Sequence, residues 1–159
     1  MNKKLLVQKL IELTKANLQA AYDAAQSTYD IATNEESKAE NKYDTRGLEA
    51  SYLAGAQAER VADIKATLAS FENLNIRTFT EESKIALTAL VEICSYGKNS
   101  QVLLMPKGGG QNIEFEKQQI QVITPNSPLG KNLIGKEVGD IIQISAADKF
   151  RDYEILKIS

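Results

Sequence analysis

The sequence predicts an α+β protein: a long antiparallel helical hairpin, or coiled coil, over residues 1–75, then a small β domain over residues 76–159. Two observations predict this division. Apolar and small residues recur at helical spacing through most of the first half, whereas they alternate with a period of two from Ser83 onward. The chain of 159 residues has room for one ordinary domain or two small ones.

The first predicted helix runs from Lys3 to about Ala32, a span that is rich in alanine and contains no Gly or Pro. Residues spaced mainly three or four apart form its expected buried face: Leu6, Leu10, Leu13, Asn17, Leu18 and Ala21. Toward Ala24 and Ala25 this face thins to small side chains, so a partner helix can approach closely.

The second predicted helix extends from about Asp44 to Phe71. Its seam is formed by Val61, Ile64, Leu68 and Phe71, spaced three, four and three residues apart as in a coiled coil. Two long helices with a short connection must run antiparallel to bury such stripes. The polar stretch 33–44 between them is therefore expected at the exposed tip of a hairpin.

The second half is expected to form a mostly antiparallel sheet. A first strand is predicted over residues 85–94, a turn at 96–99 and a return strand at 102–105, followed by a loop with Gly108–Gly110. Further strands are expected at 120–123, 140–145 and 152–158. The three glycines are predicted to form a hairpin loop, because no Lys-Ser/Thr and helix follow them as a phosphate-binding loop requires.

One short helix is predicted within this domain, over residues 127–135. Ser127 is the expected N-cap, Pro128 the first helical residue and Gly135 the terminator. Its apolar side chains are expected in the core: Leu129, Leu133 and Ile134.

Composition excludes several classes of function. The chain has no histidine, which rules out Ser-His-Asp triads, Cys-His nucleophiles and zinc sites built on histidine. The single Cys94 cannot form an intrachain disulfide. A net charge of −2 argues against nonspecific nucleic-acid binding as the main activity. No apolar run is long enough for a membrane helix and no signal peptide is recognisable, so a cytoplasmic protein is expected.

The acidic side chains are concentrated near the predicted tip. Positions 23–44 contain six acids and only two lysines. The acids are Asp23, Asp30, Glu35, Glu36, Glu40 and Asp44.

Short motifs in the second half resemble a known family. Residues 123–130 read Ile-Thr-Pro-Asn-Ser-Pro-Leu-Gly, residues 133–136 read Leu-Ile-Gly-Lys, and residues 153–155 read Tyr-Glu-Ile. In this order they resemble the C-terminal domain of the GreA/GreB transcript-cleavage factors. Residues 40–43, Glu-Asn-Lys-Tyr, are similar to the Glu-Asn-x-x-Tyr at the tip of the hairpin in that family. The resemblance is specific over 120–158 and loose over the helices.

This resemblance implies an FKBP-like C-terminal domain that docks at the rim of the secondary channel of bacterial RNA polymerase. It implies that the hairpin enters the channel, where acidic tip residues help to hold the second catalytic Mg²⁺, which then assists cleavage of backtracked RNA by the polymerase itself. The protein would be no enzyme and have no cofactor of its own. It would meet nucleic acid only through the elongation complex, avoid membranes, and act as a monomer.

The resemblance assigns roles to individual residues. Glu36 and Glu40 are the expected metal-directing acids, with Glu35 as the alternate. Partner contacts are expected at Asn41, Asp44, Asn126 and Lys131. Residue type alone also permits a solvated tip, with Thr33 and Glu36 as a capping box and Asp44 as the N-cap of the second helix.

The tip departs from the family pattern at two points, one of which is Tyr43, which follows Glu-Asn one position sooner than in Gre factors. Gre factors have Asp, two intervening residues and then Glu-Asn, whereas Ser37 stands three residues before Glu40. Either Glu36 substitutes in a shifted loop, or the metal pair is absent and the protein is a channel-binding inhibitor or modulator. A coiled-coil adaptor unrelated to polymerase is the third possibility. Prolyl isomerisation is disfavoured, because the second half lacks the aromatic pocket that this activity uses.

Overall fold

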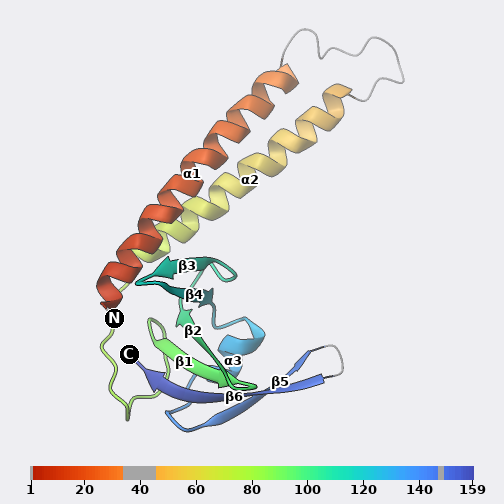
Figure 1. The fold of residues 1–159 in the computed structure, drawn as a ribbon. Coiled ribbons are helices and arrows are strands. Elements are labelled where there is room, and N and C mark those ends of the chain that lie inside the picture. Colours follow the sequence, from red (N-terminus) through yellow and green to blue (C-terminus); the bar gives the residue numbers. More distant parts are fainter. Residues whose placement is uncertain (1, 34–45, 147–148) are drawn as a thin grey trace. The chain divides into compact units, whose positions relative to one another are not determined.

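The computed structural model describes residues 2–33, 46–146 and 149–159 (Figure 1). The chain divides into two compact units, one of residues 9–72 and one of residues 1–8 with 73–159. The predicted fold class is confirmed: two long helices precede a mostly antiparallel sheet with one short helix. None of the described helices is long and apolar enough to cross a membrane.

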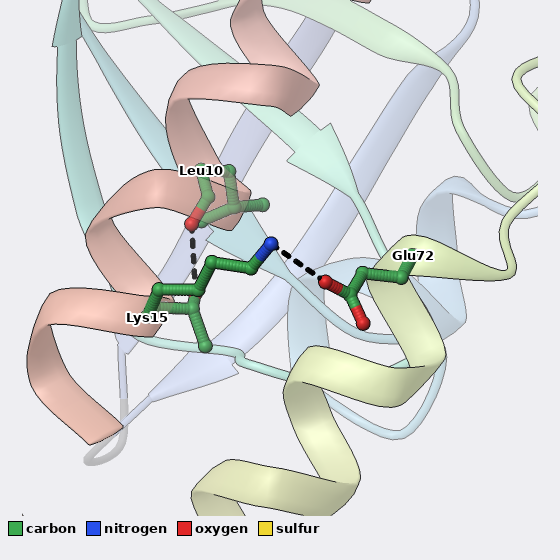
Figure 2. Close-up of polar contacts among 4 residues, drawn as sticks. Leu10, Lys15 and Glu72 are labelled. Carbon is green, nitrogen blue, oxygen red and sulfur yellow. Dashed lines mark hydrogen bonds and ion pairs between the residues drawn. The ribbon is translucent and has the colours of Figure 1, made fainter. Parts of the chain in front are cut away.

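The two long helices are α1 (Lys3–Thr33) and α2 (Arg46–Glu72), and all but the first six residues of α1 belong to the helical unit. At the start of α1, the backbone N–H of Leu5 donates to the Asn2 side chain over 3.3 Å, which satisfies one free amide of the first turn. Lys15 of α1 and Glu72 of α2 form an ion pair of 2.8 Å, which joins the C-terminal end of α2 to α1 (Figure 2).

The seam of α2 follows a regular heptad. Its shielded positions alternate in spacing between three and four residues: Gly47, Ala50, Ala54, Gln57, Val61, Ile64, Leu68 and Phe71. Such spacing keeps one stripe of a helix facing its partner. The four predicted seam residues at the C-terminal end are thereby confirmed.

The buried stripe of α1 differs from the prediction at two positions. Leu13 and Asn17 are exposed, whereas Thr14 is buried; Leu6, Leu10, Leu18 and Ala21 are shielded as predicted. Thr14 tolerates burial because its hydroxyl donates to the Leu10 carbonyl over 2.7 Å. A seam through Thr14 leaves Leu13 on the flank, so the larger apolar residue is not the buried one.

Six strands form one sheet in the order β3-β4-β2-β1-β6-β5. Their bounds are β1 Leu90–Ser95, β2 Lys98–Leu104, β3 Asn112–Phe115, β4 Gln118–Ile123, β5 Ile141–Ala146 and β6 Lys149–Ile158. Within the described residues, β2 and β4 pair in parallel and the other neighbouring strands are antiparallel.

The short helix α3 (Pro128–Leu133) packs on this sheet. Leu133 is fully buried in the core with side chains such as Val91 and Ile155, and Leu129 is half-buried against the same cluster. The prediction that Ile134 is a core residue is wrong, because Ile134 is the C-cap and 44% exposed. Gly135 follows it with a φ of +80°, which confirms the predicted helix end.

The first strand begins later than its sequence alternation predicts. Residues 85–89 are not part of a strand, and β1 starts at Leu90. Thr88 takes a left-handed φ of +73° and its hydroxyl accepts a hydrogen bond from the backbone N–H of Arg77 over 2.9 Å. This turn interrupts the extended backbone and leaves Leu87 exposed, although Ile85 before it and Ala89 after it remain buried.

The prediction of a hairpin loop at Gly108–Gly110 is also wrong. This loop connects β2 to β3, and those strands are not neighbours because β4 lies between them. Strand β3 was not predicted, because its alternation of polar and apolar residues extends over only four positions, Asn112–Phe115.

In the N-terminal segment, Lys3 lies next to the aromatic ring of Phe79. The Lys3 ammonium lies 4.5 Å from the centre of the Phe79 ring and finds no hydrogen-bond acceptor among the described residues. Burial lowers the pKa of Lys3 to about 8. The attraction between the cation and the ring therefore does not fully replace the lost hydration.

Replacement of this lysine should change how stability depends on pH. The pKa of Lys3 falls from 10.5 to about 8 on folding, so between these values the unfolded chain binds more protons than the folded one. The unfolding free energy of the parent should therefore rise, relative to that of Lys3→Met, as pH increases from 8 to 10.5. Denaturant titrations of both proteins across this range test this, and parallel curves would contradict it.

Candidate functional site

The predicted tip residues fall between the ends of the two long helices along the chain. Glu35, Glu36, Glu40, Asn41 and Asp44 lie outside the described residues, after α1 ends at Thr33 and before α2 begins at Arg46. Their assigned roles therefore remain predictions.

Two acids near the tip lie on the exposed side of α1. Gln19 Nε2 donates to Asp23 Oδ1 over 2.9 Å, and Gln26 Nε2 donates to Asp30 Oδ1 over 2.8 Å. Each glutamine precedes its acid by four residues, the spacing that places side chains together on a helix. Of the six acids at positions 23–44, the structure thus describes Asp23 and Asp30, and each carboxylate accepts a hydrogen bond from a glutamine of α1.

A groove of about 620 Å³ lies beside α3 in the β domain. Its lining comes from the β2–β3 loop, from β4, from the start of α3 and from the β5–β6 strand pair. Apolar side chains and backbone dominate the lining, which includes Val122, Pro128, Leu129, Ile144 and Tyr153. Such a groove suits an apolar segment of a partner with a few polar contacts at its edge.

A tight turn before α3 shapes one wall of the groove. The hydroxyl of Ser127 accepts a hydrogen bond from the Gly130 N–H over 3.0 Å and donates one to the Thr124 carbonyl over 2.7 Å. Gly130 is pressed against that same carbonyl, so a Cβ at this position would collide with it. This geometry gives the three residues of the motif separate roles: Ser127 caps the helix, Pro128 starts it and Gly130 allows the close approach.

Asn126 and Lys131 lie on either side of this turn and are both exposed. Neither lines the groove, but Asn126 directly precedes Ser127, which does, and Lys131 follows Gly130 on α3. The structure therefore places the two predicted contact residues of this domain near one surface feature. Sequence reasoning missed Ile144 and the glycine loop as parts of it, whereas Tyr153 and the lining residues between 123 and 129 stood in quoted motifs.

A second, polar hollow of about 270 Å³ lies on the sheet beside Glu92, Gln101, Glu116 and Lys157. Glu92 already accepts a hydrogen bond from Asn99 Nδ2 over 2.9 Å. Within the part of the chain that the structure describes, no three Cys, Asp or Glu side chains are grouped so that they could hold a metal ion.

Residues 82–159 match the family described as Transcription elongation factor, GreA/GreB, C-term. The chain is 25% identical over 153 residues to Transcription elongation factor GreA of Buchnera aphidicola subsp. Acyrthosiphon pisum, covering 96% of this chain and 87% of that protein. GreA of Psychromonas ingrahamii is 31% identical over 100 residues, 62% of this chain and 60% of that one. Gfh1 of Thermus thermophilus, a GreA factor homologue of known structure, is 22% identical, covers 94% of both chains and gives a TM-score of 0.38.

Substitution of the glycine in the turn should destabilise the β domain. In Gly130→Ala the new methyl group collides with the Thr124 carbonyl, and overpacking of this kind costs ~1–3 kcal/mol of unfolding free energy. We expect a lower melting temperature in a thermal unfolding scan.

Gly55→Ala is the matched control, because a Cβ there meets nothing within 4 Å. Within α2 this change should stabilise the protein by roughly 0.5–1 kcal/mol. Equal melting temperatures for Gly130→Ala and the parent would contradict the packing described for the turn.

Proposed function

This chain is a transcription elongation factor of the GreA/GreB type, and from this membership we propose that it binds bacterial RNA polymerase with its hairpin inserted into the secondary channel. There it would assist the polymerase in cleaving backtracked RNA. The chain itself would act as an accessory factor and not as an enzyme.

The observation that carries this proposal is the extent of the similarity. The curated GreA relative aligns with 96% of this chain and 87% of its own length, so the alignment includes the hairpin as well as the β domain. The family match at 82–159 alone would support only the second half. Both parts that the proposed activity needs are therefore present in one chain.

The dimensions of the hairpin agree with such a role. The 31 residues of α1 extend over about 46 Å at 1.5 Å per residue. We propose that the β domain docks at the rim of the channel through the α3 groove, with Asn126 and Lys131 at its edge.

Glu36 and Glu40 would supply the chemistry at the tip, with Glu35 as the alternate. Carboxylate oxygens are the ligands that Mg²⁺ prefers, and one or two of them suffice beside ligands from another source. A Mg²⁺ shared with the polymerase active site would stabilise charge on the attacking and leaving oxygens when bound. The role of this chain is to bring the carboxylates there and hold them; Asn41 and Asp44 would contact the channel beside them.

One sequence feature favours a second candidate function. Ser37 stands where the family pattern has Asp, so the usual acidic pair is incomplete unless Glu36 replaces it. With no metal bound at the tip, the protein would occupy the channel and inhibit or modulate polymerase without cleavage. The two functions share the binding site and differ only in the chemistry of the tip.

Substitution of the tip acids should separate binding from cleavage. In purified backtracked complexes the parent protein should shorten the transcript, whereas Glu36→Ala/Glu40→Ala should reduce shortening to the level without factor, because no carboxylates remain to hold the metal. Affinity for polymerase should change less than about threefold, since the docking groove is intact. Unchanged cleavage by the double variant would contradict the assignment; displacement of a Gre factor without cleavage by the parent would favour the modulator.

Reversal of charge beside α3 should weaken docking. Asn126→Ala/Lys131→Glu should raise the dissociation constant for polymerase by roughly tenfold, equivalent to about 1.4 kcal/mol, because contacts at the edge of the groove are lost. Lys117→Glu, a similar change at the exposed β3–β4 turn, is the matched control and should bind like the parent. Equal binding by all three proteins, measured by fluorescence anisotropy, would place docking elsewhere.

A further inference from the structure

The sheet ends in two edge strands that differ in their protection against other strands. β3 at one edge has only four residues and includes the charged Glu114. β5 at the other edge has six residues, Ile-Ile-Gln-Ile-Ser-Ala, without a charge or a proline (Figure 1). Proteins usually protect an edge by short length, charge or proline, because unpaired backbone groups there can bind another strand. The sequence of β5 offers none of these protections.

The hydrogen bonds to β6 identify the backbone groups of β5 that point outward. The Ile155 N–H donates to the Asp140 carbonyl over 2.9 Å, and the same antiparallel register continues to the end of β5. In such a register every second residue bonds to the neighbouring strand. The N–H and C=O groups of Ile141, Gln143 and Ser145 therefore point away from β6. Because β5 is the last strand of the sheet, no further strand among the described residues receives them.

The side chains around this edge add apolar surface to it. Ile141 is 67% exposed, and Phe150, which lies opposite Ser145 on β6, is 65% exposed. Gln143 is exposed as well, and its amide donates to Asp152 Oδ1 over 2.8 Å. The edge therefore combines outward backbone groups with exposed apolar side chains, which suits an uncharged strand of similar length.

A second copy of β5 is such a strand. When two β5 strands pair antiparallel about a two-fold axis at Gln143, Ile141 lies opposite the partner's Ser145. The three outward residues of each strand then face one another, and each opposed pair exchanges two hydrogen bonds. Ser145 is small, so the Phe150 ring can reach across it to the partner's Ile141.

The charges on β6 are also compatible with this pairing. Asp152 lies opposite Gln143, so the two copies of Asp152 are separated by two glutamines, or about 14 Å across three strand spacings. Glu154 lies opposite Ile141, which places it in one row with the partner's Ser145 and not with the partner's Glu154. Self-pairing therefore brings no like charges on these strands into contact.

We propose that the open edge of β5 binds β5 of a second copy, so that the two sheets join across a two-fold axis. This inference does not depend on the proposed function, because it concerns only the edge of the β domain. Two six-residue strands bury little area compared with the roughly 1,200–2,000 Å² of a stable interface. The dimer is therefore reversible and forms at high protein concentration, whereas the monomer prevails in dilute solution.

Sedimentation velocity of the full chain from roughly 5 to 500 µM tests this association. The parent should shift from monomer toward dimer over this range. In Gln143→Lys two lysines face each other at the two-fold axis, which should raise the dissociation constant of the dimer by roughly tenfold or more. Gln119→Lys, the same change at an exposed position of the inner strand β4, is the matched control and should associate like the parent.

Hydrogen exchange of the parent tests the location of the interface. At high protein concentration the amides of Ile141, Gln143 and Ser145 should exchange at least about fivefold more slowly than at low concentration, because they become hydrogen-bonded. The amides of the alternate residues of β5 already bond to β6 and should change less.

Four results would overturn the inference. The first is a parent that stays monomeric over the whole range, and the second is a dimer that Gln143→Lys leaves intact. The third is a dimer in which exchange at these three amides does not depend on concentration, since its interface then lies on another surface. The fourth is protection of these amides by polymerase core enzyme and not by a second copy. A thermal scan checks that Gln143→Lys is folded, as expected for an exposed position on an edge strand.

Discussion

The structure of the hairpin depends on the burial of one narrow stripe along each of two helices. Isolated helices are marginally stable in water, so α1 and α2 need this shared seam to persist over their length. Buried side chains such as Leu10, Val61 and Leu68 each contribute ~1.5–3 kcal/mol relative to exposure. The Lys15–Glu72 ion pair is largely exposed and contributes at most about 1 kcal/mol of stability. Its main effect is to help align α1 with α2.

The composition of the seam differs between the two ends of the hairpin. Near the start of α1 and the end of α2 the seam contains mainly Leu, Val, Ile and Phe, whereas near the end of α1 and the start of α2 it contains mainly Ala, Gly and Thr. The large side chains of the second part, such as Tyr29 and Tyr52, are exposed. In the β domain the tight turn at Ser127 and Gly130 shapes the groove, while the sheet core provides stability.

Much of the fold could be predicted from the sequence, because both helices and most strands follow the periods of regular structure. The failures have local physical causes. Thr14 replaces Leu13 in the seam through a side-chain hydrogen bond, and Thr88 ends the extended run by a left-handed φ. The Gly108–Gly110 loop joins β2 to β3 although β4 lies between them in the sheet. This connection depends on the strand order, which the local sequence pattern does not encode. Asn126 and Lys131 were found through motif resemblance, whereas Ile144 joins the groove only through tertiary packing.

The central claim is that the hairpin of this chain lies inside the polymerase channel. The most direct test places a photoreactive amino acid at Ala56, an exposed position of α2, and illuminates an elongation complex. We expect crosslinks to the polymerase subunits that line the channel, and their loss when an excess of a Gre factor is added. Crosslinks that the Gre factor does not suppress, or crosslinks only to other copies of this chain, would contradict the claim.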